Sequence, residues 1–550
     1  MRDARTILVA VRSRFGSVRS RLGSLETSRG LALLCVGIAL AFVLPLSWLV
    51  IEAVTVDPER TRELLFRWRT AEILLNSLLL MGGVTALSIL IGVPLAYLTT
   101  RTDLPFRRFF TVAVALPLVV PSYVGAFSFV SAFGPQGEFH DLLAPLGVER
   151  LPEIYGLHGA IVVITLYTYP YVYLTARASL LSLDTTLIEA ARTLDHTRWE
   201  AFRRVTLPHI RPATAAGALL AALYAISDFG TPAIMRVSVF TQQIYVEYNA
   251  FGQEYAAMLS LQLLAVVLVV LALEQRIRST RSVEGGTGGR SGTPVSLGRW
   301  RWPATLLPVG VVTLALVVPV WILGLWLVRA DAGRPSLAFE WSFALNSATV
   351  ALAAAAVAVL AALPIAYFAA RDSSPLAAVT ERVTYVGFAV PGIVLALALV
   401  YFGAGYEALE IPYAPRIYQT IPLLVFAYVI RFTPQAVGTL RSGVLQVDPT
   451  IVEAARTLGE TPGGAFRRVT LRLIAPSVTA GAALVFLTTM KELPVTLILR
   501  PTGFETIVTQ IWRAQEAAYF QYAAVPALLL LVISGLSMVV LLSQGGQEGL

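Results

Sequence analysis

The side chains of this chain that could do chemistry are few and widely spaced. Its four histidines are scattered, and no two stand at a spacing that binds zinc (His140, His158, His196, His209). The single cysteine, Cys35, excludes a disulfide framework and a cysteine-based metal cluster. The sequence contains no phosphate-binding loop of the Walker A type and no catalytic Ser/His/Asp or Cys/His arrangement. We therefore expect no catalytic residue, no metal site and no cofactor, and we predict that the chain is not an enzyme.

Two carboxylates stand in apolar stretches long enough to cross a membrane. Asp228 lies sixteen residues after Pro212 (228 − 212), and Glu492 lies sixteen after Pro476 (492 − 476). At about 1.5 Å per residue, each should lie near the middle of the membrane. A charge there costs roughly 2.5–3.5 kcal/mol on insertion scales and usually faces a cavity or a partner. The matched positions indicate a translocation pathway, and a buried ion pair that only fixes helix packing is the alternative.

Other residues near the two carboxylates could share this role. Lys491 and Arg431 are candidate partners for Glu492, and Pro232 and Pro494 would interrupt the helices and free backbone carbonyls nearby. The candidate residues of the pathway are therefore Asp228, Glu492, Lys491, Arg431, Pro232 and Pro494.

The composition requires a membrane protein. Of the 550 residues, 56% are hydrophobic and only 14% are charged, whereas a typical globular chain has about 25% charged residues. The formal net charge is +8, from 42 Lys and Arg against 34 Asp and Glu. Most of the cations fall in alternate connecting segments, so they indicate topology with both termini in the cytoplasm rather than nucleic-acid binding.

The apolar stretches predict an all-α polytopic fold with about twelve transmembrane helices. A window of about 20 apolar residues per span locates them near 30–51, 73–99, 109–133, 157–181, 213–235, 255–273, 303–328, 343–370, 379–403, 418–440, 477–499 and 520–543.

The chain contains an internal repeat. Residues 189–213 and 453–477 are identical at 16 of 25 positions, at an offset of 264. Earlier segments align at an offset of 270: Asn76-Ser77 with Asn346-Ser347, Pro94 to Tyr97 with Pro364 to Tyr367, and Pro121 with Pro391. Six spans per half predict a parallel repeat.

We divide the chain into a basic cytoplasmic segment (1–29), a first half (30–275), a flexible cytoplasmic linker (276–302), a second half (303–543) and a tail (544–550).

The most similar stretch of the two halves is a polar loop, at 184–212 and 448–476. In the first copy we expect an amphipathic helix beginning after Asp184, which would cap it, and then a second short helix that Pro208 ends. Interfacial helices with Arg side chains at lipid headgroups are the alternative. That alternative does not explain residue-level identity in both copies, whereas docking of two equivalent soluble partners does.

The duplicated sequence EAA, followed after a gap by a small residue, a Phe and a Leu-Pro pair, resembles the EAA loop of importer-type ABC transporter permeases. The resemblance implies that each loop forms a coupling helix seated in a groove of a cytoplasmic ATPase, which hydrolyses ATP as a dimer. The usual glycine is Gly459 in the second copy, but Asp195 takes its place in the first. The first copy has Pro208 where the second copy has Arg472. The two coupling sites should therefore be unequal. The coupling residues that the resemblance implies are Glu189, Ala190, Ala191, Asp195, Phe202, Pro208, Glu453, Ala454, Ala455, Gly459 and Phe466.

The chain most resembles the fused ferric iron permeases, which carry two six-helix halves on one chain. The resemblance lies in residues 227–232 (SDFGTP), 491–501 and 503–506. The resemblance implies import of ferric iron across the plasma (inner) membrane from an extracytoplasmic solute-binding protein. Fused thiamine, phosphonate and related permeases share much of the pattern, so these substrates remain alternatives. A proton-coupled secondary transporter is the alternative of a different class, although the twin loops argue against it. We also expect the transmembrane helices to contact membrane lipid.

Overall fold

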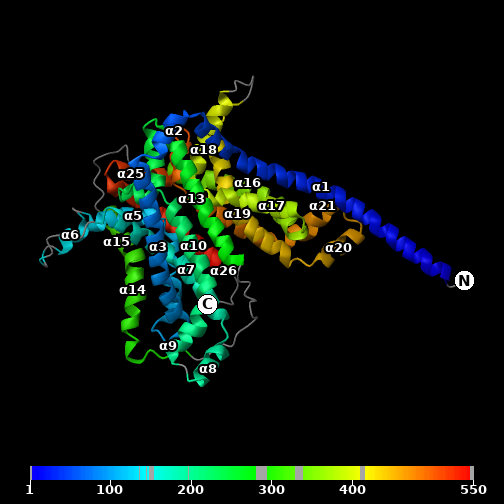
Figure 1. Cartoon of the computed structure of the whole chain (residues 1–550), viewed down its shortest axis with the longest axis horizontal. Coiled ribbons are helices and arrows are strands. Elements are labelled where there is room, and N and C mark those ends of the chain that lie inside the picture. Colours follow the sequence, from blue (N-terminus) through cyan, green and yellow to red (C-terminus); the bar gives the residue numbers. More distant parts are fainter. Residues whose placement is uncertain are drawn as a thin grey trace. The chain divides into compact units, whose positions relative to one another are not determined.

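The computed structural model describes residues 3–134, 137–143, 145, 147, 154–195, 197–279, 294–328, 338–408 and 415–544. It is helical in both halves (Figure 1). The helices of the first half are α1 (Asp3–Thr55), α2 (Pro58–Leu65), α3 (Trp68–Arg101), α4 (Arg107–Ala113), α5 (Ser122–Phe133), α6 (Glu138–Leu143), α7 (Leu157–Ser182), α8 (Thr185–Thr193), α9 (Arg198–Ala201), α10 (Leu207–Ser227), α11 (Gly230–Ile234), α12 (Phe240–Asn249) and α13 (Gln253–Ser279).

The second half repeats much of this order. Its helices are α14 (Leu306–Val312), α15 (Val318–Val328), α16 (Trp341–Arg371), α17 (Pro375–Ala389), α18 (Gly392–Glu407), α19 (Ile421–Gln446), α20 (Pro449–Thr457), α21 (Pro462–Ala465), α22 (Leu471–Leu473), α23 (Ala475–Met490), α24 (Pro494–Leu499), α25 (Ile507–Glu516) and α26 (Ala524–Gln544).

The twelve predicted spans all coincide with helices, but not all of them are single straight helices. In the described residues, eight helices are long and apolar enough to cross a membrane, three more spans are bent pairs, and a shorter apolar helix stands at the twelfth position. The predictions for 109–133 and 379–403 as simple spans are wrong, because the helix breaks before Pro121 and before Pro391. Each proline holds an extended backbone and precedes a new helix, α5 or α18.

Contacts divide the chain into two compact units that differ from the two halves of the sequence. Residues 1–47, 349–388 and 425–489 form one unit, and residues 48–348, 389–424 and 490–550 form the other. The second unit therefore contains the first half from Trp48 onward together with α14, α15, α18 and α24 to α26.

Helices α3, α7 and α10 pack on one another as a bundle in the second unit (Figure 1). Tyr167, Tyr169 and Tyr173 of α7 are buried in it, and Tyr169 donates a hydrogen bond to the carbonyl oxygen of Val114 at 2.5 Å. In the first unit, Val444, Val447 and Ile474 form a buried cluster where α19, α20 and α23 meet, with Leu363 and Tyr367 of α16 packed against it. These two cores position the loops that follow.

Both ends of the expected linker lie in the described part of the chain. Helix α13 continues to Ser279, and the following residues up to 293 lie outside the described part of the chain, as does the tail after Gln544. The last part of the linker is bound to the first half: the amide of Val295 donates to the carbonyl of Arg101 at 2.7 Å, and Leu297 donates its amide to the Asp103 carboxylate at 2.8 Å. A sequence without apolar periodicity can still be held by backbone hydrogen bonds, which composition does not reveal.

Candidate functional site

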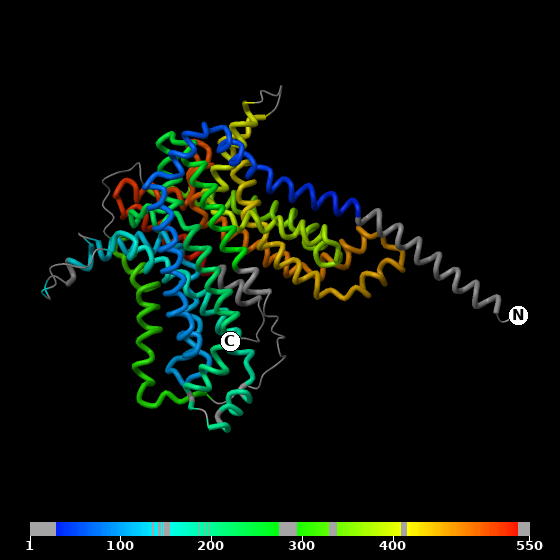
Figure 2. Tube along the Cα trace, viewed as in Figure 1, coloured from blue at the N-terminus to red at the C-terminus, as the bar shows by residue number. Residues whose placement is uncertain are grey.

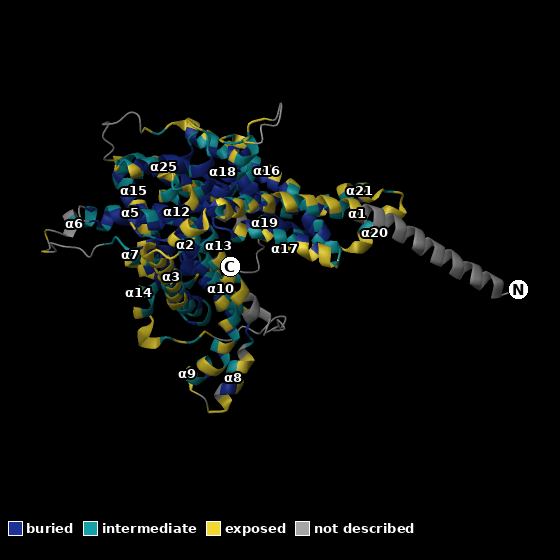
Figure 3. Ribbon diagram, turned by 45° about the horizontal axis from the view of Figure 1, so that its top comes forward, coloured by how far each residue is buried: buried dark blue, intermediate teal, exposed yellow. Residues whose placement is uncertain are grey.

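The first loop begins with the expected capped helix. Asp184 accepts a hydrogen bond from the Thr186 amide at 3.0 Å at the start of α8. Glu189 and Ala190 are exposed, whereas Ala191 is buried. Figure 3 shows α8 and α9 as mostly exposed. The predicted amphipathic helix and its cap are confirmed, and His196 lies outside the described residues.

The second loop repeats this arrangement. Asp448 accepts a hydrogen bond from the Thr450 amide at 2.9 Å, and this interaction with Thr450 lowers the pKa of the Asp448 carboxyl. Glu453 and Ala454 are exposed, and Ala455 is half-buried. The carboxylates Glu189 and Glu453 thus point into solvent at equivalent positions of two separate helices.

Both loop helices end in a left-handed turn. Asp195 has φ 61° and Gly459 has φ 98°, so the replacement of the glycine leaves the turn in the same region of backbone space. Aspartate tolerates this region better than most residues do. The residues just before the turns, Leu194 and Leu458, are 73% and 86% exposed. Both leucines therefore leave apolar surface open next to the turn.

The phenylalanines of the loops contact their own chain. Phe202 packs edge-to-face on Tyr97 of α3 with ring centroids 5.4 Å apart, and Phe466 packs in the same way on Tyr367 of α16 at 5.1 Å. Each phenylalanine opens a π-helical turn of identical sequence, Phe202–Thr206 and Phe466–Thr470. In this arrangement Phe202 and Phe466 anchor the loops to the membrane helices.

The prediction that Pro208 ends a short helix is wrong. The chain continues from α9 through the π-helical turn into α10 as one apolar helix, Trp199–Ser227, which can be followed in Figure 2. Pro208 lies two residues after the π-helical turn, inside this continuous helix. In the second copy, which has Arg472 instead, the helix bends by 71° near Ile474 before it enters α23.

The two candidate carboxylates lie at equivalent helix breaks. Helix α10 ends at Ser227 and α11 begins at Gly230, so Asp228 lies between them; α23 ends at Met490 and α24 begins at Pro494, so Glu492 lies between those. The spans expected over 213–235 and 477–499 are therefore interrupted, as predicted from Pro232 and Pro494. The carbonyls of Asp228 and Glu492 accept hydrogen bonds from the Thr241 and Thr496 hydroxyls.

Hydroxyl groups surround Asp228. Ser122 donates to its carboxylate at 2.9 Å, and Tyr224 donates to the Ser122 hydroxyl at 3.0 Å. The buried Tyr123 hydroxyl has no hydrogen-bond partner in the structure and lies close enough to Asp228 and Glu492 to interact electrostatically with both. Nothing in the sequence alone marks these residues as part of the site, although Ser122 and Tyr123 directly follow Pro121, which is repeated as Pro391.

The two helix breaks meet inside the second unit. A Cβ atom on Gly230 would lie 2.5 Å from the Tyr123 Cβ and 3.4 Å from the Leu493 Cδ2. Only glycine fits this approach, so the break that carries Asp228 packs beside the break that carries Glu492. Glu492 is 8% exposed, and the neighbouring Lys491 interacts with it electrostatically.

The other candidate cation, Arg431, belongs to α19 in the first unit. Its guanidinium lies 5.7 Å from the centroid of the Phe432 ring. Pairing of Arg431 with Glu492 stays a prediction. Within the described part of the chain, no three His, Cys, Asp or Glu side chains are placed to share a metal ion.

The repeated Asn-Ser pairs hold the beginnings of equivalent helices. Asn76 donates to the Ser238 carbonyl at 3.1 Å and Ser77 accepts from the Phe240 amide at 3.1 Å, at the start of α12. Asn346 and Ser347 make the same contacts with the Glu505 carbonyl and the Ile507 amide, both at 2.9 Å, at the start of α25. The pairs therefore have the same structural role in both halves.

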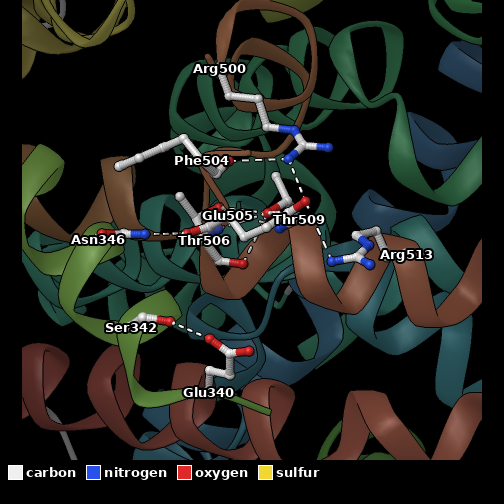
Figure 4. Close-up of polar contacts among 9 residues, drawn as sticks. All are labelled: Glu340, Ser342, Asn346, Arg500, Phe504, Glu505, Thr506, Thr509 and Arg513. Carbon is white, nitrogen blue, oxygen red and sulfur yellow. Dashed lines mark hydrogen bonds and ion pairs between the residues drawn. The ribbon is translucent and has the colours of Figure 1, made fainter. Parts of the chain in front are cut away.

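Around Glu505 the second half adds an ion-pair cluster, drawn in Figure 4. Its carboxylate lies 2.6 Å from Arg500 and 3.4 Å from Arg513, and accepts a hydrogen bond from Thr509 at 2.8 Å. Thr506 and Thr509 form a capping box at the start of α25. Much of the segment 500–506 thus orders the start of α25.

Two repeated sets of membrane helices, each with an exposed capped loop and an interrupted helix that carries a carboxylate, define a two-half membrane transport permease. The family model for binding-protein-dependent transport system inner membrane components matches residues 88–280 and 362–544. The chain therefore belongs to this family of permeases, and it is a multi-pass protein of the inner membrane.

The chain is similar to two ferric iron permeases over most of its length and to a sulfate permease over less than half of it. It is 32% identical to the Fe(3+)-transport system permease protein FbpB 2 of Haemophilus influenzae, over 93% of this chain and 97% of the relative. It is 23% identical to the ferric transport system permease protein FbpB of Actinobacillus pleuropneumoniae, over 87% of this chain and 72% of the relative. The sulfate transport system permease protein CysT of Escherichia coli is 26% identical over 42% of this chain and 86% of its own length.

Proposed function

We propose that this chain is the permease subunit of an ATP-driven importer that moves ferric iron from an extracytoplasmic solute-binding protein across the inner membrane. The observation that carries the proposal is the pair of capped loop helices with exposed Glu189 and Glu453. Each would dock on one subunit of a cytoplasmic ATPase dimer. The left-handed turns at Asp195 and Gly459 favour one mode of docking for both loops.

Ferric iron is the proposed substrate because relatives of that printed function match both halves of the chain together. Thiamine, phosphonate and related small solutes are the alternatives, and the match of one half to a sulfate permease keeps anions among them. Two carboxylates at adjacent helix breaks favour a cation, since they attract positive charge in a region of low dielectric.

We place the pathway at the meeting of the two helix breaks. Asp228, Glu492 and the Tyr123 hydroxyl offer oxygen atoms, the ligands that hard cations prefer. Lys491 beside Glu492 would weaken retention of a cation, so the ion passes and is not held. Pro232 in α11 and Pro494 at the start of α24 shape the two short helices that follow the breaks.

Reconstitution tests this function. Purified permease in liposomes is combined with the ATPase and the binding protein, and uptake of radioactive ferric iron is measured with and without ATP. We expect uptake that needs all three components and is reduced by excess non-radioactive ferric iron but not by thiamine, a phosphonate or sulfate. Uptake driven by a pH gradient without ATP would instead indicate the secondary transporter.

A further inference from the structure

In each half, one arginine at the end of a membrane helix binds the carbonyls where another membrane helix turns into the loop. Arg101, the last residue of α3, donates to the carbonyl oxygens of Leu180 and of Leu183, the latter at 2.9 Å. Arg371, the last residue of α16, donates to those of Val444 at 3.2 Å and Val447 at 2.8 Å. The partner residues lie at the ends of α7 and α19.

These contacts are equivalent between the halves. Arg371 follows Arg101 by 270 residues, the offset of the early repeat, and Val444 and Val447 follow Leu180 and Leu183 by 264, the offset of the loops. The first contact lies in one compact unit and the second in the other. The same bonds therefore form twice, in separate packing environments.

The arginines bind at the joint between a span and its coupling helix. Helix α7 ends at Ser182, Leu183 follows, and Asp184 already caps α8; α19, Val447 and Asp448 have the same order before α20. The last carbonyls of a helix lack intrahelical partners and carry partial negative charge, which a guanidinium group satisfies with several donors in a fixed plane. Because the joint is so short, this bond sets the direction in which the coupling helix leaves the span.

A second contact from the same helices holds the far end of each loop. Tyr97 and Tyr367 lie four residues before Arg101 and Arg371, hence on the same helix face. Their rings pack on Phe202 and Phe466, where the chain returns toward the membrane. One face of α3 thus contacts both ends of the first loop, and one face of α16 contacts both ends of the second.

We infer that Arg101 and Arg371, with Tyr97 and Tyr367, are positioning residues that transmit movement of the coupling helices to the membrane helices. In the first half the route is direct, because α3 packs against α10, which leads to Asp228. The inference rests on the proposed ATP-driven function. Movement of each coupling helix would then reach the membrane through the second span of its half, α3 or α16, as well as through the spans joined to the loop.

The test measures how many ferric ions enter per ATP hydrolysed in reconstituted transporter. The double variant R101Q/R371Q should still co-purify with the ATPase, because the exposed faces of α8 and α20 are unchanged. Its uptake per ATP should fall about tenfold, because the carbonyls at both joints lose the charged donors that hold them. R101K/R371K should recover part of this loss, because lysine keeps the charge but not the planar set of donors.

The exposed arginines Arg108 and Arg382 provide the matched control, R108Q/R382Q, which should keep the normal ratio. If the glutamine variant folds poorly, Y97L/Y367L and Y97F/Y367F make the same test. The leucine pair should lower uptake per ATP more than the phenylalanine pair, which keeps both rings.

Two results would overturn the inference in different ways. A normal ratio in R101Q/R371Q and in Y97L/Y367L, with a working wild-type transporter, would contradict the positioning role alone. No ATPase on the wild-type permease and no ATP-dependent uptake would contradict the proposed function and the positioning role with it.

Discussion

At the scale of single residues, Asp228 and Glu492 carry the account of the pathway. Each lies in a break between two helices, and the breaks pack together at Gly230 and Leu493. A purely structural carboxylate would stabilise the fold by pairing with a fixed partner, whereas a carboxylate of the pathway would bind the passing ion. The two roles predict different losses when the charge is removed.

We expect Asp228→Asn and Glu492→Gln to insert normally and to bind the ATPase, but to slow uptake about tenfold each, as the loss of about 1.4 kcal/mol of charge interaction would. Uptake and thermal stability are measured on the same preparations. If Glu492 instead pairs with Lys491 or Arg431 for structure, its loss strands a cation and costs about 3–5 kcal/mol of stability, restored by neutralising the cation. Normal uptake in both single variants and the double variant would remove these residues from the mechanism.

The turn residues of the loops give a second prediction at this scale. Gly459→Ala should strain a backbone with φ 98° by about 1 kcal/mol or more and weaken ATPase association through the second loop. Asp195→Gly should leave association unchanged, because glycine adopts φ 61° without strain. Co-purification of the ATPase measures both. Equal association in G459A and wild type would show that the turn does not direct docking.

Among the helices, α12 and α25 are each tied by an Asn-Ser pair to the second span of their own half. Replacing Ser77 or Ser347 by alanine leaves the amide at the start of α12 or α25 without its acceptor inside the protein. We expect each change to lower the free energy of unfolding by about 1–3 kcal/mol. Thermal unfolding in detergent measures this, with the exposed Ser182→Ala as control. A loss in the control as large as in S347A would contradict the explanation.

The sequence predicts the positions of the spans well because a membrane imposes one length and one polarity on every helix. It predicts the loop helices and their caps because Asp184 and the repeat mark them. The breaks at Pro121 and Pro391 escaped a hydropathy window, which averages over a proline inside an apolar run. The contacts of Arg101 and Arg371 were not predictable, since each joins residues that only the folded bundle brings together.

At the scale of the whole molecule, the chain consists of two sequence halves that do not coincide with the two packing units. Helices α18 and α24 to α26 of the second half pack within the unit that contains most of the first. The linker is bound to the first half at Val295 and Leu297, beside Arg101. The halves are therefore joined by more than the covalent chain.

A cut after Gly288, with both fragments co-expressed, should leave a working transporter. The cut precedes the bound part of the linker, so the second fragment keeps the residues that dock beside Arg101. We expect uptake within about twofold of the intact chain, measured with fragment amounts matched by immunoblot. Moving the cut to follow Leu297 separates the docking segment from the second half and should lower assembly. Loss of uptake at the first cut, despite insertion of both fragments, would contradict this.

Two equivalent loops would dock the cytoplasmic ATPase, and reversing the charge of their exposed carboxylates should prevent this docking. In the double variant E189R/E453R each exposed carboxylate becomes a cation, while the caps at Asp184 and Asp448 and the anchors at Phe202 and Phe466 stay unchanged. The permease, matched for insertion, is purified and the amount of ATPase bound to it is measured. We expect the bound ATPase and the ATP-dependent uptake both to be lost in the double variant and only reduced in each single variant. Wild-type amounts of ATPase on the double variant would contradict it.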